Sequence, residues 1–134
     1  SPHDPFVFNR DGDPAYRRTP YTNINDPEFG VGYGWDTYKK GYVDEVMYLH
    51  KRIIGVVDEI LAQSEQPPVI IIQGDHGIPR LKSENAKFQI LNAYFLPGVT
   101  DHGLYPTISP VNSFRIVFNN YFNSDYELLP DKSY

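Results

Sequence analysis

An acidic side chain and a histidine stand next to each other in the sequence VIIIQGDHG, which spans residues 69–77. Carboxylate oxygens and imidazole nitrogens are both good ligands for zinc and manganese. Gly74 and Gly77 flank the pair, and glycine permits tight turns with unusual dihedral angles that could direct two neighbouring side chains at one ion. Asp75 and His76 are therefore candidate metal ligands.

A purely structural interpretation of the same pair is equally open. Asp75 could cap the turn that follows it, and His76 could be an ordinary loop histidine, since short motifs often occur without the function. Asp-His-Gly also occurs at residues 101–103. No apolar strand leads into that second copy, so we expect His102 to lie in a surface loop.

The residues that precede the pair predict the element that would position it. Residues 69–72 are four consecutive β-branched apolar residues, a run too short for a helix. Such a run is typical of a strand that is buried on both faces, as in a parallel sheet covered by helices. Ligands of these sheets bind beyond the carboxyl ends of the strands. We therefore expect Asp75 and His76 at the carboxyl end of a central strand, facing a crevice.

The rest of the chain predicts two helices and a second strand. Apolar residues recur at helical spacing over residues 38–64, and polar side chains such as Asp44 and Glu45 fall on the opposite, solvent-facing side. Residues 88–95 predict a strand. Ser109 followed by Pro110 predicts a helix start, as N-cap and first helical residue. The predicted fold class is α/β, with a partial parallel sheet flanked by helices.

Composition limits the classes of protein to consider. The 134 residues predict a single domain, and residues 9–36 predict a long aromatic-rich loop within it. A formal charge of −5, with the 12 Lys and Arg residues scattered, argues against nucleic acid as a partner. No cysteine is present, which excludes disulfides and thiolate metal sites. No apolar stretch approaches the roughly 18 residues of a membrane span.

The order of three segments resembles a known group of enzymes. VIIIQGDHG, a strand ending in Leu-Pro-Gly, and ISPVNSFRIVFNNYF at residues 108–122 together resemble the C-terminal part of the sulfatase and alkaline phosphatase superfamily. They are most similar to sulfatase-like membrane enzymes related to lipoteichoic acid synthase. The resemblance implies the C-terminal portion of a three-layer sandwich, in which Asp75 and His76 bind a divalent metal ion.

The resemblance also implies a substrate site. His3-Asp4-Pro5-Phe6 resembles a family segment, His-x-Pro-Phe, whose histidine lies beside the phosphate or sulfate group, which implies a catalytic role for His3. Arg80 is a candidate contact for the same anionic ester, although a solvated arginine is the simpler interpretation. Manganese, zinc, magnesium and calcium all remain open as the metal.

The family's Ser or Thr nucleophile and a further acidic ligand lie far upstream of the Asp-His pair. The resemblance therefore implies that residues 1–134 are a fragment of a larger catalytic domain and are inactive in isolation. It places the parent enzyme at the extracytoplasmic face of a bacterial membrane, while the fragment itself has no membrane segment and is soluble. We expect self-association through the apolar sheet surface that the missing strands would leave exposed.

A second class of function stays open beside the enzyme. The chain could be a non-catalytic α/β module whose loops bind an anionic ligand or a partner chain, with His3 an ordinary solvated residue near a chain end. Upstream sequence separates the two classes. A Ser or Thr in a strand-to-helix turn, with an acidic residue after an earlier strand, favours the enzyme, and their absence favours the module.

Overall fold

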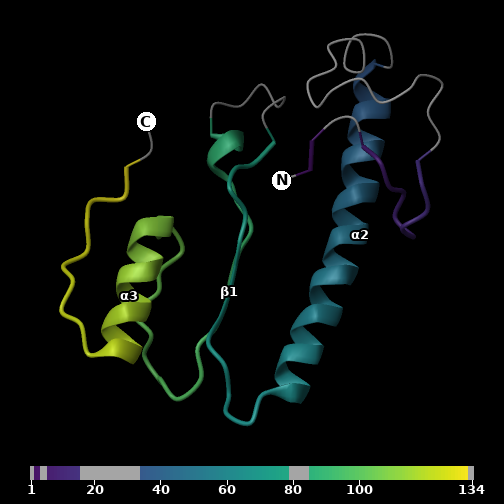
Figure 1. The fold of residues 1–134 in the computed structure, drawn as a ribbon. Coiled ribbons are helices and arrows are strands. Elements are labelled where there is room, and N and C mark those ends of the chain that lie inside the picture. The colour runs from purple at the N-terminus through teal and green to yellow at the C-terminus, as the bar shows by residue number, and fades with distance from the viewer. Residues whose placement is uncertain (1, 4–5, 16–33, 79–84, 133–134) are drawn as a thin grey trace. The chain divides into compact units, whose positions relative to one another are not determined.

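The computed structural model describes residues 2–3, 6–15, 34–78 and 85–132. The elements follow in the order α2, β1, η1, β2 and α3 (Figure 1). The chain divides into two compact units, Ser1–Ser64 and Glu65–Tyr134. The first unit contains α2 and the second contains the other four elements. Helices and strands both occur, so the α/β class is confirmed in its broad sense.

The first unit is built on one long helix, α2, which spans Gly34–Gln63. It begins about four residues earlier than predicted, so residues 34–36 are helical and do not belong to a loop. The helix ends before Pro67 and Pro68, because proline cannot continue the hydrogen-bond ladder. Of the predicted loop over residues 9–36, residues 16–33 lie outside the described residues.

A short hairpin occupies the first residues of the predicted loop. An antiparallel bridge joins Phe8 to Pro14. The side chain of Asn9 closes the turn, since its Oδ1 accepts the N–H groups of Asp11 and Asp13, each at 2.9 Å. Asparagine is favoured in such turns because its short side chain can replace a backbone acceptor. Phe8 therefore pairs within its own hairpin.

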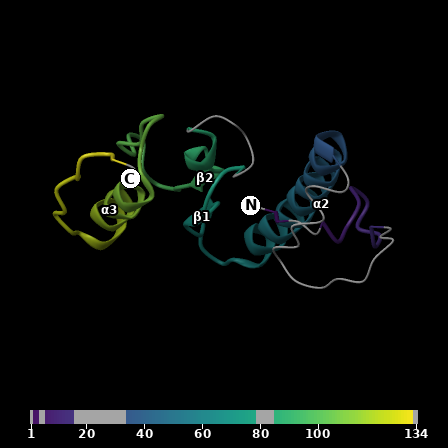
Figure 2. The same ribbon diagram turned by 90° about the horizontal axis from the view of Figure 1, so that it is seen from above.

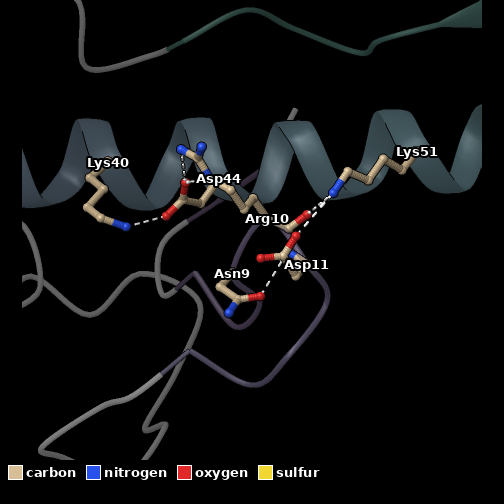
Figure 3. A network of polar contacts seen from close by, with 6 residues as sticks. All are labelled: Asn9, Arg10, Asp11, Lys40, Asp44 and Lys51. Carbon is tan, nitrogen blue, oxygen red and sulfur yellow. Dashed lines mark hydrogen bonds and ion pairs between the residues drawn. The ribbon is translucent and has the colours of Figure 1, made fainter.

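Charged side chains attach this hairpin to α2 (Figure 3). Arg10 donates to Asp44 Oδ1 from Nε at 2.9 Å and from Nη2 at 2.8 Å. Lys40 bonds to the other carboxylate oxygen, Oδ2. Lys51 Nζ donates to the Arg10 carbonyl at 3.0 Å and lies 3.2 Å from Asp11 Oδ1. Asp44 of the helix therefore binds two cations, Arg10 and Lys40, while Lys51 binds the turn of the hairpin.

The hairpin reverses the expected orientation of the helix. We expected Asp44 and Glu45 to face solvent, but both are buried, with Asp44 only 5% exposed. Glu45 accepts the N–H of Val7 at 3.2 Å, and burial raises the pKa of its carboxyl group. Several apolar residues of the opposite side remain at least 40% exposed: Val43, Met47, Ile54 and Leu61.

An aromatic cluster completes the first unit. Phe6 is buried, with its ring centroid 5.2 Å from that of Tyr38 and 6.1 Å from that of Tyr42. A Cβ added at Gly41 would lie 2.4 Å from the Phe6 ring. The glycine in the middle of the helix therefore provides the space into which Phe6 packs.

The second unit contains a two-stranded sheet. Strands β1, Ile70–Gln73, and β2, Asn92–Phe95, lie side by side and pair antiparallel, with Ile70 opposite Phe95 and Gln73 opposite Asn92 (Figure 2). The expectation of parallel strands is therefore wrong for this pair. A backbone hydrogen bond beyond the strand ends, from Gly74 N–H to the Leu91 carbonyl, continues the antiparallel ladder. Antiparallel neighbours of this kind need no helical crossover between them.

The limits of the elements also differ from expectation. Strand β2 begins at Asn92 and not at residue 88, because Ala86–Phe88 form the short 3-10 helix η1. All four residues of β1 are half-buried in the described chain, whereas we expected burial on both faces.

Helix α3, Pro110–Phe122, begins as predicted. Ser109 is the N-cap and its side chain accepts the N–H of Asn112, while Pro110 is the first helical residue. The helix ends at Asn123, whose φ of 52° is left-handed. The chain then reverses, and the yellow C-terminal segment runs back alongside α3 (Figure 1).

A carboxylate near the end of this segment binds the start of α3. Asp131 accepts the Ser109 N–H at 2.8 Å and the Tyr105 hydroxyl at 2.5 Å, and it also accepts the Asn112 amide at 2.9 Å. Hydrogen bonding by Ser109, then by Tyr105, lowers the pKa of Asp131 to about 2. The location suits a negative charge, because the N-terminus of a helix carries partial positive charge.

We predict that Asp44→Ala lowers the free energy of unfolding by about 1.5–3 kcal/mol, the size of a hydrogen bond to a charged group. The loss is no larger because Arg10 and Lys40 are themselves mostly solvated and do not become buried unpaired charges. Urea unfolding of the altered and unaltered chains measures this loss of stability. Asp58→Ala, on an exposed position of the same helix, is the control and should change stability by less than about 0.5 kcal/mol. Equal effects of the two substitutions would contradict the role of Asp44.

We predict that Asp131 titrates with a midpoint near 2, as its lowered pKa requires. A group whose pKa is lowered on folding stabilises the fold above its ordinary pKa of 3.8, and this contribution is lost as the pH falls toward 2. The carboxyl carbon shift of Asp131 and the amide shift of Ser109 should therefore move together in an NMR titration. A midpoint near 4 would show that the segment does not hold Asp131 against α3.

Candidate functional site

The candidate metal ligands lie in a turn directly after β1. Two backbone hydrogen bonds hold this turn, from Gly74 N–H to the Leu91 carbonyl at 2.8 Å and from Gly77 N–H to the Lys87 carbonyl at 2.7 Å. The two residues between these glycines are Asp75 and His76. The turn is therefore fastened at both ends to the segment that leads into β2.

The two glycines serve this turn in a different way from the one we expected. Neither Gly74 nor Gly77 has a left-handed φ. A Cβ added at Gly77 would instead lie 1.9 Å from the carbonyl oxygen of Ala86 and 2.7 Å from that of Gln89. At Gly74 the nearest atom would be 3.4 Å away, which is ordinary contact. Glycine is thus required at residue 77 because of close backbone approach and not because of its dihedral angles.

The hydrogen bonds of His76 fix its tautomer. Its Nδ1 lies 2.7 Å from the carbonyl oxygen of Gly77. A carbonyl can only accept, so Nδ1 carries the hydrogen, and in the neutral ring Nε2 carries the lone pair that can bind a metal. A backbone carbonyl that holds the other ring nitrogen is the usual arrangement around metal-binding histidines.

The distance within the pair suits a shared ion. His76 Nε2 lies 3.6 Å from Asp75 Oδ2. Two ligands bound tetrahedrally to zinc, with bonds of about 2.0–2.1 Å, would be roughly 3.4 Å apart. The Asp75 side chain is 70% exposed and that of His76 is 31% exposed.

Asp75 also has the structural role that we left open. Its Oδ1 accepts the backbone N–H of His76 at 3.0 Å, which caps the turn. The two oxygens of this carboxylate therefore have separate contacts, one to the backbone and one toward the imidazole ring. When His76 is protonated, the same pair forms an ion pair. The capping and metal-binding interpretations are compatible with each other.

The described residues supply two ligands at this turn and no more. In the part of the chain that the structure describes, no group of three or more His, Cys, Asp and Glu side chains could hold a metal ion. A structural or catalytic zinc site normally has three or four protein ligands. The pair can therefore be only part of such a site.

The positions of the other two predicted site residues relative to this turn stay predictions. His3 is exposed and belongs to the first unit, whereas Asp75 and His76 belong to the second, so its place beside a substrate stays a prediction. Arg80 lies outside the described residues, and its predicted contact with an anionic ester also stays a prediction.

The second Asp-His-Gly has a different local structure. His102 Nε2 lies 2.8 Å from the Leu96 carbonyl, so Nε2 is here the protonated nitrogen. Asp101 accepts the N–H of Gly103 at 3.1 Å and not the N–H of its own histidine. His102 lies in a loop, as predicted, but its side chain is half-buried and not at the surface that we expected. Identical letters thus give two different side-chain arrangements.

A pocket of about 250 Å³ adjoins this second copy and was not predicted. Its lining residues come from the loop, from α3 and from the C-terminal segment: Asp101, His102, Gly103, Ile116, Asn119, Asn120 and Leu128. No local sequence pattern could have indicated it, because the C-terminal segment contributes one wall. Most of its polar groups already bond to protein, as Asn120 does to the His102 carbonyl at 3.1 Å.

Comparisons of the chain with models of protein families, with curated proteins and with solved structures give no match. No helix in the described ranges combines the length and apolarity that crossing a membrane requires.

We predict that Gly77→Ala destabilises the second unit, because the new methyl group would overlap the Ala86 carbonyl and force the backbone apart. Overpacking of this kind costs roughly 1–3 kcal/mol. Gly74→Ala is the matched control and should be tolerated. Urea unfolding and the amide shift of Lys87 measure both effects. Equal tolerance of the two substitutions would mean that the turn does not pack as closely as described.

Proposed function

We propose that this chain is the C-terminal part of a metal-dependent, sulfatase-like enzyme that hydrolyses or transfers phosphate or sulfate esters. Asp75 and His76 provide two ligands of its divalent ion. One observation carries the proposal: His76 Nε2 lies 3.6 Å from Asp75 Oδ2, while the Gly77 carbonyl holds Nδ1. An imidazole that binds a metal through Nε2 needs its hydrogen on Nδ1, and a backbone carbonyl is one of the usual partners of that Nδ1–H group.

The position of the pair supports the same proposal. The two side chains follow the carboxyl end of β1 directly, which is where α/β proteins bind ligands. The antiparallel β2 does not argue against a larger parallel sheet, because many α/β folds carry an antiparallel strand on an otherwise parallel sheet. We infer that β1 belongs to such a sheet in a longer protein, which is the three-layer sandwich of the superfamily that the sequence resembles.

The types of the two ligands limit the identity of the metal ion. A carboxylate together with an imidazole suits zinc or manganese better than magnesium or calcium, which prefer oxygen ligands alone. A bound divalent ion lowers the pKa of a coordinated hydroxyl and neutralises charge on a phosphoryl or sulfuryl oxygen. In this proposal the remaining ligands and the Ser or Thr nucleophile come from other parts of a longer, extracytoplasmic protein.

Two further residues have proposed roles toward the substrate. His3 would donate a hydrogen bond to an ester oxygen or protonate the leaving group, a role suited to a group with an ordinary pKa near ~6.5. Arg80 would pair with the anionic group. Each role is tested by its own substitution in the longer protein, so that failure of one leaves the Asp75 and His76 proposal intact.

Metal binding by the 134-residue chain gives the first test. We predict weak binding of Mn²⁺, because two ligands leave the ion mostly hydrated. Its paramagnetism should broaden the NMR signals of residues 74–77 selectively. His76→Ala should abolish the broadening, while His102→Ala, the matched change in the second Asp-His-Gly, should leave it in place. Equal or stronger broadening at residues 101–103 would contradict the proposed site.

Catalysis is tested by paired assays on p-nitrophenyl phosphate, a phosphodiester analogue and p-nitrophenyl sulfate. The longer protein should turn over at least one of them with added Mn²⁺ or Zn²⁺, and His76→Ala should lower its kcat/KM by at least about 100-fold, beyond the usual effect of residues that merely support ligands. The 134-residue chain alone should be inactive. A longer protein that binds an anion without any turnover would favour the non-catalytic module.

A further inference from the structure

The pocket beside the second Asp-His-Gly has the dimensions of a small binding site. It lies within the second unit, between the loop of residues 101–103, α3 and the C-terminal segment. Its volume of about 250 Å³ is slightly below the roughly 300–1,000 Å³ of pockets for drug-sized molecules, so it suits a ligand of few atoms. Ile116, which is buried, and Leu128 supply apolar surface.

The side-chain nitrogens that can only donate already bond to backbone carbonyls. Asn120 Nδ2 donates to the His102 carbonyl at 3.1 Å, and Asn119 Nδ2 donates to the Tyr126 carbonyl at 2.9 Å. Asn119 Oδ1 also accepts the Tyr126 N–H, so both ends of this amide are used. The imidazole of His102 donates from Nε2 to the Leu96 carbonyl.

Three acceptor atoms of the same lining remain open. The Gly103 N–H bonds to Asp101 Oδ1 at 3.1 Å, and no described residue donates to Oδ2. In the neutral ring of His102, the lone pair is on Nδ1 because Nε2 carries the hydrogen. Asn120 Oδ1 likewise receives no hydrogen bond from the residues that the structure describes.

These atoms require a ligand that donates hydrogen bonds and carries positive charge. A carboxylate, an imidazole lone pair and an amide oxygen all attract donors, and hydrogen bonds to a carboxylate are strongest from a cationic donor. A primary ammonium group has three N–H donors and no acceptor, which matches three open acceptors. Of the described residues that line the pocket, none is Lys or Arg, and Ile116 and Leu128 can contact an alkyl chain.

A metal ion fits this lining less well. Metal ions bind in compact sets of ligands, with bonds of about 2.0–2.2 Å to zinc, and have no use for apolar walls. Asp101 and His102 are only two such ligands, and no set of three or more His, Cys, Asp and Glu side chains exists within the described ranges. The apolar surface and the volume therefore favour an organic cation.

We propose that this pocket binds a small alkylammonium group, with Asp101, His102 and Asn120 as the acceptors of its three N–H groups. The Leu96 carbonyl holds the imidazole in the tautomer that this requires. The proposal concerns the second Asp-His-Gly alone and does not depend on a metal at residues 75 and 76.

Three probes with the same butyl chain test the proposal by NMR titration of the 134-residue chain at neutral pH and constant ionic strength. n-Butylamine, which is protonated there, should shift the amide signals of residues 101–103 and 120 saturably. n-Butyltrimethylammonium has the charge but no N–H donor, and n-butanol has no charge. Both should bind at least about tenfold more weakly, because they lack the charge-assisted hydrogen bonds.

The source of the ammonium group is tested with Nα-acetyl-lysine methylamide, which carries the same chain on a peptide unit. Tighter binding than that of n-butylamine would identify a lysine side chain as the ligand, and weaker binding a free amine.

One substitution removes the charge of the pocket without removing its loop contact. Asp101→Asn keeps an oxygen that can accept the Gly103 N–H, and it should raise the Kd for butylammonium by at least about tenfold. Asp125→Asn is the matched control, since Asp125 is exposed and does not line the pocket, and it should leave the Kd unchanged.

Four results would overturn the proposal. They are the absence of saturable shifts at residues 101–103, equally tight binding of n-butyltrimethylammonium, and equal effects of the two aspartate substitutions. The fourth is selective broadening of the signals of residues 101–103 by Mn²⁺, which would identify a metal site in place of an amine site.

Discussion

The approach of Gly77 to the carbonyl groups of Ala86 and Gln89 is the constraint on which the candidate site depends. Only a hydrogen atom fits at the Cα of this residue, where a Cβ would be 1.9 Å from the Ala86 oxygen. The same residue donates its N–H to Lys87 and presents its carbonyl to His76 Nδ1. One close backbone contact therefore determines both the path of the turn and the tautomer of its histidine.

Elements that depend on local chemistry could be predicted from the sequence. The run of β-branched residues at β1, and Ser109 with Pro110 at the start of α3, act through their own backbone preferences and hydrogen bonds. Features that depend on partners far away in the sequence could not be predicted. Asp44 looks like a surface residue in its helix, and its burial depends on the hairpin that carries Arg10, 34 positions earlier.

In the candidate site, too, local features could be predicted from the sequence and features that depend on distant segments could not. The types of Asp75 and His76 indicated metal binding, and the preceding strand distinguished them from the identical letters at residues 101–103. The predicted reason for Gly74 and Gly77, freedom of their dihedral angles, is wrong. Dihedral freedom is a property of a single residue, whereas the close approach at Gly77 depends on how the segment around Ala86 packs against it. The antiparallel pairing of β1 and β2 was missed for a related reason: apolar runs indicate burial but not direction.

The tautomer of His76 is the most direct test of this account. Long-range proton–nitrogen NMR distinguishes a protonated ring nitrogen from one that carries a lone pair, and it follows both nitrogens as Zn²⁺ is added. The account predicts that neutral His76 is protonated at Nδ1 and that zinc shifts the Nε2 resonance while Nδ1 remains protonated. A ring protonated at Nε2, or a zinc response at Nδ1, would contradict it.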